Sequence, residues 1–105
     1  MNEQIFELSF NIIGHAGEAK SIAFEALAEA KKGNIEKARE MMKQSKTVIT
    51  KAHRFQTELI QKEANGEVNE VSVILIHAQD HLMNSMTYQQ LVDEFIDLYA
   101  KLENK

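Results

Sequence analysis

The sequence predicts an all-α protein of one domain, residues 1–105, folded as an up-down-up antiparallel three-helix bundle. The chain contains no proline and only four glycines, so few positions can interrupt a helix. The two strongest breaks, Gly33-Asn34 and Asn65-Gly66, divide it into three nearly equal parts. In each part apolar residues recur at spacings of three and four, and the short connections between the parts force neighbouring helices to run antiparallel.

The first helix is expected over about residues 3–32. Its most regular feature is a series of small residues at spacings of three and four: Ala16, Ala19, Ala23, Ala26 and Ala30. Small side chains on one side of a helix let a neighbouring helix approach closely. Gly14 and Gly17 extend this thin side toward the N-terminus.

The second helix is expected over about residues 35–65. Asn34 is the predicted N-cap, and Glu36 follows in the first turn, where a negative charge favours the helix. Helical periodicity continues through Ile35, Ala38, Met41, Met42, Ser45, Val48, Ile49, Ala52, Phe55 and Leu59. Asn65-Gly66 is a typical C-terminal stop.

The third helix is expected over about residues 69–102. Its periodic positions are Val71, Leu75, Ala78, Leu82, Ser85, Gln89, Val92, Ile96 and Tyr99. Residues 71–76 include apolar side chains on every side of the helix, whereas a three-helix bundle buries only one stripe of each helix. We therefore expect association with further copies; the alternative is a monomer with a wider core near the start of this helix.

Composition excludes several classes of protein. The absence of cysteine excludes disulfides, thiolate metal sites and cysteine nucleophiles. The net charge is −4 and the basic residues are scattered among acidic ones, which argues against a nucleic-acid-binding surface. No apolar run approaches the roughly 20 residues that span a bilayer, and the first residues lack the basic start of a signal peptide. We expect a cytoplasmic protein that does not insert into a membrane.

The segment His77-Ala78-Gln79-Asp80-His81-Leu82-Met83 is the strongest chemical signal in the chain. His77, Asp80 and His81 fall on one side of a helix, next to an apolar run. Two histidines four residues apart are suited to zinc, but Ala78 stands where a zinc protease needs a glutamate. A neutral imidazole is also a good acceptor and donor of a phosphoryl group. The remaining interpretation is structural, with the histidines hydrogen-bonded to each other and to the backbone.

Two further histidines and two methionines are candidates for a role in this site. His15 and His53 are expected at the surface or in packing rather than in a site. Met83 and Met86 either form an adaptable docking patch or fill the core, and core filling is favoured.

Several blocks together resemble a known family. Val73-Ile74-Leu75-Ile76 followed by the His77 to Met83 segment is similar to the signature of the lactose/cellobiose-type enzyme IIA of the bacterial phosphoenolpyruvate-dependent sugar phosphotransferase system. The further matching blocks, in the same order along the chain, are Ala16-Gly17-Glu18-Ala19-Lys20-Ser21, Glu25-Ala26-Leu27, Gly33-Asn34, Ala52-His53-Arg54-Phe55-Gln56-Thr57 and Glu63-Ala64-Asn65-Gly66-Glu67.

This resemblance implies a homotrimer of three-helix subunits that carries a phosphoryl group on His77. The protein HPr would be the donor, and a cysteine of the cognate enzyme IIB the acceptor, during uptake of a disaccharide such as lactose, cellobiose or diacetylchitobiose. Gln79 and His81 are candidate donors to the phosphoryl oxygens. The rival interpretation is a non-catalytic interaction or regulatory module that uses the histidine face to bind a metal or a partner.

The resemblance also implies that Asp80 of three subunits surrounds one metal ion per trimer on the threefold axis. Oxygen ligands arriving in threes favour Mg²⁺, and the nearby His81 makes zinc the alternative.

Overall fold

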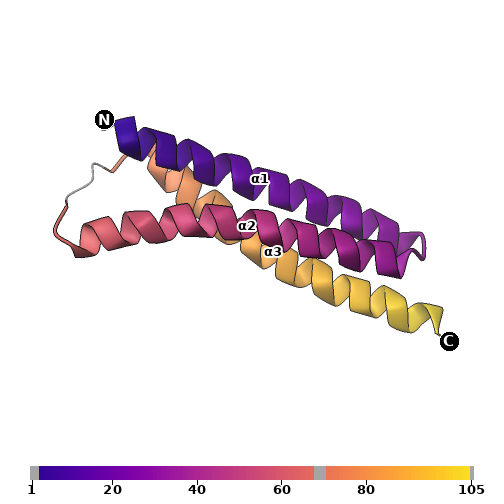
Figure 1. The fold of residues 1–105 in the computed structure, drawn as a ribbon. Helices are drawn as coiled ribbons and strands as arrows, with labels where there is room; N and C mark the ends of the chain where they lie inside the picture. The colour runs from indigo at the N-terminus through magenta and orange to yellow at the C-terminus, as the bar shows by residue number, and fades with distance from the viewer. Residues whose placement is uncertain (1–2, 68–70, 105) are drawn as a thin grey trace.

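The computed structural model describes residues 3–67 and 71–104, which form three α-helices and no strand (Figure 1). Helix α1 spans Glu3–Lys31, α2 spans Ile35–Ala64 and α3 spans Val73–Glu103. Helices α1 and α3 run in the same direction and α2 runs in the opposite one, within an elongated body of 56 × 19 × 18 Å. The predicted all-α, up-down-up bundle is confirmed.

The predicted thin side of α1 forms the centre of the bundle. All five alanines of its series are at most 1 % exposed. Toward the start of α1 they are joined by larger side chains, and the three helices together bury Ile5, Leu8, Ile12, Ile49, Leu59 and Leu82. Because alanine projects so little, α2 and α3 both pack closely against α1 along its length.

A buried polar chain joins all three helices near the middle of the bundle. The Gln89 Nε2 of α3 donates a hydrogen bond to Ser45 Oγ of α2 at 2.6 Å, and Ser45 Oγ donates to the Ala19 carbonyl oxygen of α1 at 2.6 Å. All three residues are at least 95 % buried. Polar groups in such surroundings are costly unless they are paired, so this chain favours one axial register of the helices over others.

The connections contain the two glycines that the sequence placed at helix ends. Gly33 and Gly66 have φ angles of 91° and 88°, in the left-handed region that glycine adopts without strain. Asn34 occupies the N-cap position of α2, but its side chain makes no capping hydrogen bond. It donates instead to Glu29 Oε1 at 3.0 Å, so Asn34 is the N-cap by position, as predicted, and its amide links the connection to α1.

The start of α3 also differs from the sequence prediction. Residues 69 and 70 lie outside the described residues, and Val71 and Ser72 are not helical. Ser72 is the N-cap, and its Oγ accepts a hydrogen bond from the Leu75 amide at 3.3 Å. The apolar pattern continues through Val71 and therefore concealed this boundary. The helix ends at Glu103, one residue beyond the prediction.

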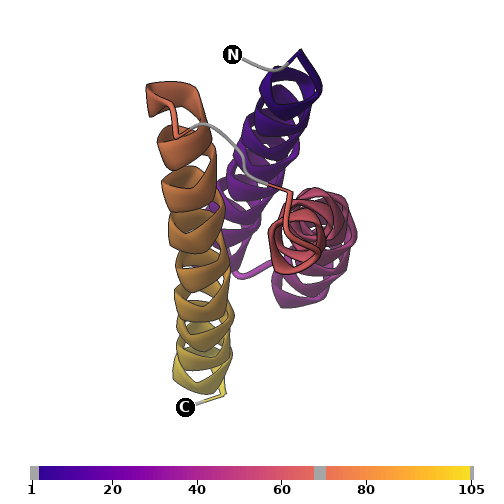
Figure 2. The same ribbon diagram turned by 90° about the vertical axis from the view of Figure 1, so that its left-hand side faces the viewer.

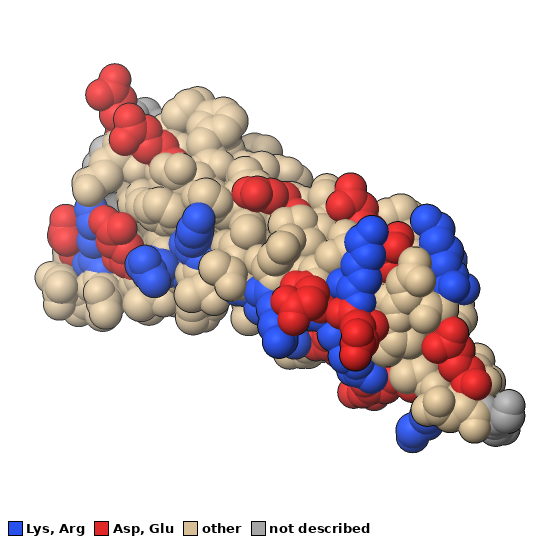
Figure 3. All heavy atoms as spheres, turned by 45° about the vertical axis from the view of Figure 1, so that its right-hand side comes forward, with Lys and Arg blue, Asp and Glu red and all other residues tan. Residues whose placement is uncertain are grey.

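One long side of α3 is not covered by either of the other two described helices. In Figure 2, α1 and α2 both lie on the same side of α3. Ion pairs join α3 to α2 at the surface: Arg39 to Asp97 at 2.9 Å and Lys46 to Asp93 at 2.7 Å. Acidic and basic side chains are interspersed on the face shown in Figure 3. Among the described helices, none has both the length and the hydrophobicity needed to cross a membrane.

Candidate functional site

The candidate site is built on the first turns of α3, where two histidines lie one turn apart. The rings of His77 and His81 are stacked, with centroids 5.7 Å apart and an interplanar angle of 10°. His77 is exposed, whereas His81 is partly buried. The structure therefore brings together two of the predicted site residues and leaves the His77 ring accessible to a partner.

His81 owes its partial burial to close contact with α1. A Cβ placed on Gly17 would lie 3.3 Å from His81 Nε2, so the glycine provides the space in which the imidazole rests. Burial lowers the pKa of His81, and the neighbouring His77 and Lys20 lower it further, although Asp80 acts in the opposite direction. A lowered pKa keeps His81 uncharged at neutral pH, in the form that offers one donor and one acceptor.

Asp80 lies on the unpartnered side of α3, which we call the α3 seam. Six apolar residues of this helix are at least half exposed, at 50–85 %, and define the seam: Val73, Ile76, Met83, Leu91, Leu98 and Leu102. Asp80 is exposed among them, and its Oδ1 accepts a hydrogen bond from Asn84 Nδ2 at 3.2 Å. Asp80 therefore lies beside the apolar seam of α3, about one turn from His77.

A metal at Asp80 would require ligands from more than one chain. Within residues 3–67 and 71–104 of a single chain, no three His, Asp or Glu side chains gather so as to hold a metal ion. One chain offers a single carboxylate here, beside the Asn84 amide. The residues fit a cation only if several copies of Asp80 come together.

Gln79 is not brought to His77 within the chain. The two positions are separated by about 200° around the helix. Gln79 faces α2, where its Oε1 accepts a hydrogen bond of 2.5 Å from Gln56 Nε2. The same Gln56 nitrogen lies 3.9 Å from Met83 Sδ.

The structure also locates the two remaining histidines and the two methionines of α3. His15 stacks on Phe55 of α2, with centroids 5.9 Å apart, and His53 is exposed, as expected for packing and surface roles. Met86 packs against the core, as predicted. Met83 is 52 % exposed, so core filling within one chain is wrong for this residue. Met83 belongs to the α3 seam, the side of the helix that α1 and α2 leave uncovered (Figure 2).

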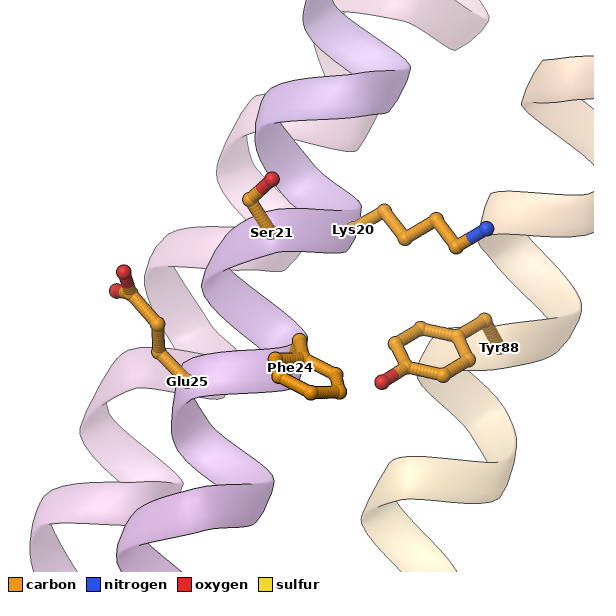
Figure 4. A pocket seen from close by; sticks show the side chains of 5 residues that line it. All are labelled: Lys20, Ser21, Phe24, Glu25 and Tyr88. Carbon is orange, nitrogen blue, oxygen red and sulfur yellow. The ribbon is translucent and has the colours of Figure 1, made fainter.

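The sequence interpretation assigned no role to two residues beside the site, Lys20 and Tyr88. The Lys20 Nζ of α1 lies 5.6 Å from the centre of the Tyr88 ring of α3. Both line an open pocket of about 540 Å³ together with Ser21, Phe24 and Glu25 (Figure 4). A signal was present: Lys20 follows Gly17 by three residues, which places both on one side of α1.

Comparison with known proteins identifies a family. Residues 7–100 match the family described as "PTS system, Lactose/Cellobiose specific IIA subunit". The lichenan-specific phosphotransferase enzyme IIA component of Bacillus subtilis is 47 % identical over 102 residues, which cover 97 % of this chain and 93 % of that protein. The N,N'-diacetylchitobiose-specific EIIA component of Escherichia coli strain K12 is 42 % identical, with 96 % and 87 % covered.

Solved structures agree in fold. The crystal structure of the cellobiose-specific enzyme IIA from Bacillus anthracis has a TM-score of 0.96 and 53 % identity, and the match covers 100 % of this chain and 96 % of that one. The chitobiose IIA of Escherichia coli, solved in solution in complex with HPr, has a TM-score of 0.82 and 40 % identity, with 94 % and 96 % covered.

Proposed function

Because the chain belongs to the lactose/cellobiose-specific IIA family of the sugar phosphotransferase system, we propose that it is a phosphocarrier and that His77 bears the phosphoryl group. The observation that carries this assignment is the accessible His77 ring, stacked on a histidine whose pKa is lowered. An uncharged His81 does not repel the cations of an incoming phosphoryl donor, and its ring can donate or accept a hydrogen bond beside His77. His53, the other exposed histidine, lies on α2 and is not part of this pair of stacked rings.

The proposed donor is HPr phosphorylated on histidine, since the chitobiose relative was solved in complex with HPr. The phosphorus–nitrogen bond of the donor histidine breaks while a new one forms to an unprotonated ring nitrogen of His77. The donor imidazole leaves with the electron pair of the broken bond, and no further proton is required. Transfer of this kind depends mainly on alignment and on hydrogen bonds to the phosphoryl oxygens.

The proposed acceptor is the cysteine thiolate of the cognate enzyme IIB. The phosphorus–nitrogen bond of His77 then breaks and a phosphorus–sulfur bond forms, after which the phosphoryl group serves sugar uptake. In this proposal the exchange between these proteins takes place at the cytoplasmic side of the transporter. Relatives are described as specific for lichenan, for N,N'-diacetylchitobiose or, in Staphylococcus epidermidis, for lactose, and the sugar itself has no contact with His77 in this scheme.

We further propose that three copies associate through the α3 seam. Its exposed apolar side chains need cover, and α1 adds exposed aromatic rings at Phe6, Phe10 and Phe24. Closed cyclic symmetry would bring the three Asp80 side chains to the axis. Three carboxylates supply oxygen ligands suited to Mg²⁺, which would neutralise their mutual repulsion.

Phosphorylation by HPr tests the assignment of His77. The wild-type chain, incubated with enzyme I, HPr and phosphoenolpyruvate, should gain the mass of one phosphoryl group in an acid-labile, base-stable form. His77→Gln should gain none and keep its helical content, because the exposed ring supports no core packing. His53→Gln is the matched control and should be labelled like the wild type.

Two outcomes would contradict the assignment. Labelling of His77→Gln, or loss of the label only in His81→Gln, would move the phosphoryl group to another residue. A wild-type chain that stays unmodified would instead favour the interaction or regulatory module.

A further inference from the structure

Lys20 reaches across the groove between α1 and α3. Figure 4 shows its side chain extending from α1 toward α3, with the Tyr88 ring extending back toward α1. The Lys20 Nζ lies 5.6 Å from the ring centre, within the range of a cation–π interaction. Burial raises the pKa of Tyr88, so the ring partner of this lysine is the neutral phenol.

Lys20 also lies near the stacked histidines. On α1, Gly17 and Lys20 are three residues apart and share one side of the helix. Gly17 is the contact point of the His81 ring, and that ring stacks on His77. Lys20 is therefore one turn from the helix position against which His81 rests, and its charge is felt at the His81 ring.

No carboxylate of the described residues neutralises the Lys20 ammonium. Among the described residues it forms no ion pair with a carboxylate, whereas Lys32, Lys37 and Lys46 each do. Glu25 lines the same pocket, but Figure 4 shows its carboxylate directed away from Lys20 and Tyr88. A phosphoryl group brings close to two negative charges, and a cation held without a counter-ion beside its site is complementary to it.

We propose that Lys20 is a catalytic residue of the transfer through His77, donating hydrogen bonds to the phosphoryl oxygens, and that Tyr88 is a positioning residue that holds the lysine between transfers. The proposal rests on the proposed function. In this proposal the flexible four-carbon stem of lysine lets the ammonium leave the ring and turn toward His77. The ammonium keeps its protons throughout and only neutralises charge on the group in transit.

The test is single-turnover transfer from phosphorylated HPr to Lys20→Met, Lys20→Arg and, as a matched control on the same helix, Lys31→Met. Lys20→Met should slow transfer by about 10- to 100-fold, the effect of losing a hydrogen bond to a charged group. Its phosphoryl equilibrium should shift toward HPr, while its affinity for unphosphorylated HPr stays unchanged. Lys20→Arg should recover most of the rate, and Lys31→Met should match the wild type.

Tyr88 provides a second, independent pair of variants. Tyr88→Phe keeps an aromatic face for the ammonium and should transfer at nearly the wild-type rate. Tyr88→Leu removes that face and should slow transfer without changing the affinity for HPr.

The possible failures are distinguishable. Wild-type rates and equilibrium in Lys20→Met would overturn the role of Lys20 and leave phosphorylation of His77 standing. A loss of HPr affinity that accounts for the slower rate would make Lys20 a docking residue and also overturn the proposal. Absence of any phosphorylation of the wild type would contradict the proposed function itself.

Discussion

The imidazole of His81 rests on α1 at Gly17, where an added Cβ would lie 3.3 Å from its Nε2. Gly14, less than one turn earlier on the same helix, is exposed, and a Cβ there would meet nothing within 4 Å. The two glycines therefore form a matched pair. One is required by a site residue, whereas the other faces open space.

Alanine at each glycine should separate helix stability from site geometry. Gly14→Ala should raise the free energy of unfolding by about 0.5–1 kcal/mol, because alanine favours a helix over glycine. Gly17→Ala should gain less, because the His81 ring must shift by a few tenths of an ångström. It should also slow phosphoryl transfer, while Gly14→Ala should not. Urea unfolding and transfer from HPr measure both; equal behaviour of the two variants would contradict this account.

Ser45→Ala should expose the cost of breaking the buried polar chain. The change removes the acceptor of the Gln89 side chain and the donor to the Ala19 carbonyl. Buried groups left without partners should lower the free energy of unfolding by about 1–3 kcal/mol. Thr47→Ala is the control: it removes a hydroxyl from an exposed position of the same helix and should change stability by no more than about 0.5 kcal/mol. Similar losses of unfolding free energy in both variants would show that the buried polar chain contributes no more to stability than an exposed hydroxyl.

Asp80→Leu tests the proposed threefold axis. We expect the wild type to sediment at three times the 12.0 kDa of the chain. Three carboxylates about 4 Å apart repel one another by about 4 kcal/mol per pair at an effective dielectric of about 20, so leucine should relieve that repulsion and add apolar contact. The variant should remain trimeric in chelator and melt no lower than the wild type does there. Its dissociation to monomers would show instead that the carboxylates hold the trimer together.

Glu29 should give the fold a pH dependence in the acid range. The hydrogen bond donated by Asn34 has the largest effect and lowers the pKa of Glu29; burial opposes it, and the charges of Lys32 and Lys37 lower the pKa further. The unfolded chain takes up this proton near the ordinary value of 4.5, before the folded chain does. The stabilisation is therefore complete above that pH and is lost as the pH falls through the lower folded pKa.

Urea unfolding of Glu29→Gln across this range measures the effect. The variant should be less stable than the wild type near neutrality, and the difference should shrink as the pH falls below 4.5. Glu58→Gln makes the same change at an exposed position of α2 and should leave the shape of the profile unaltered. A constant difference between Glu29→Gln and the wild type at every pH would contradict the role assigned to this carboxylate.

The sequence by itself determined the helices and the reactive side chains that they carry. The absence of proline and the regular apolar spacing predicted three helices. The alanine series predicted which side of α1 is buried. The pair His77 and His81 stood out because a helix places residues four apart on one side. These properties depend on residues close together in the chain, so they can be predicted without knowing which helices pack together. The α3 boundary was missed because Val71 fits the apolar pattern while Ser72 caps the helix.

Only the tertiary structure decided which groups meet. Helical periodicity gives the angle at which a side chain leaves its helix, but neither the identity of the neighbour at that angle nor its offset along the axis. Gln79 therefore turned out to face Gln56 of α2 rather than His77, while Lys20 and Tyr88 met across the α1–α3 groove. The contact between Gly17 and His81 has the same origin. It joins residues 64 positions apart, and the packing of alanine-lined α1 against α3 brings them together.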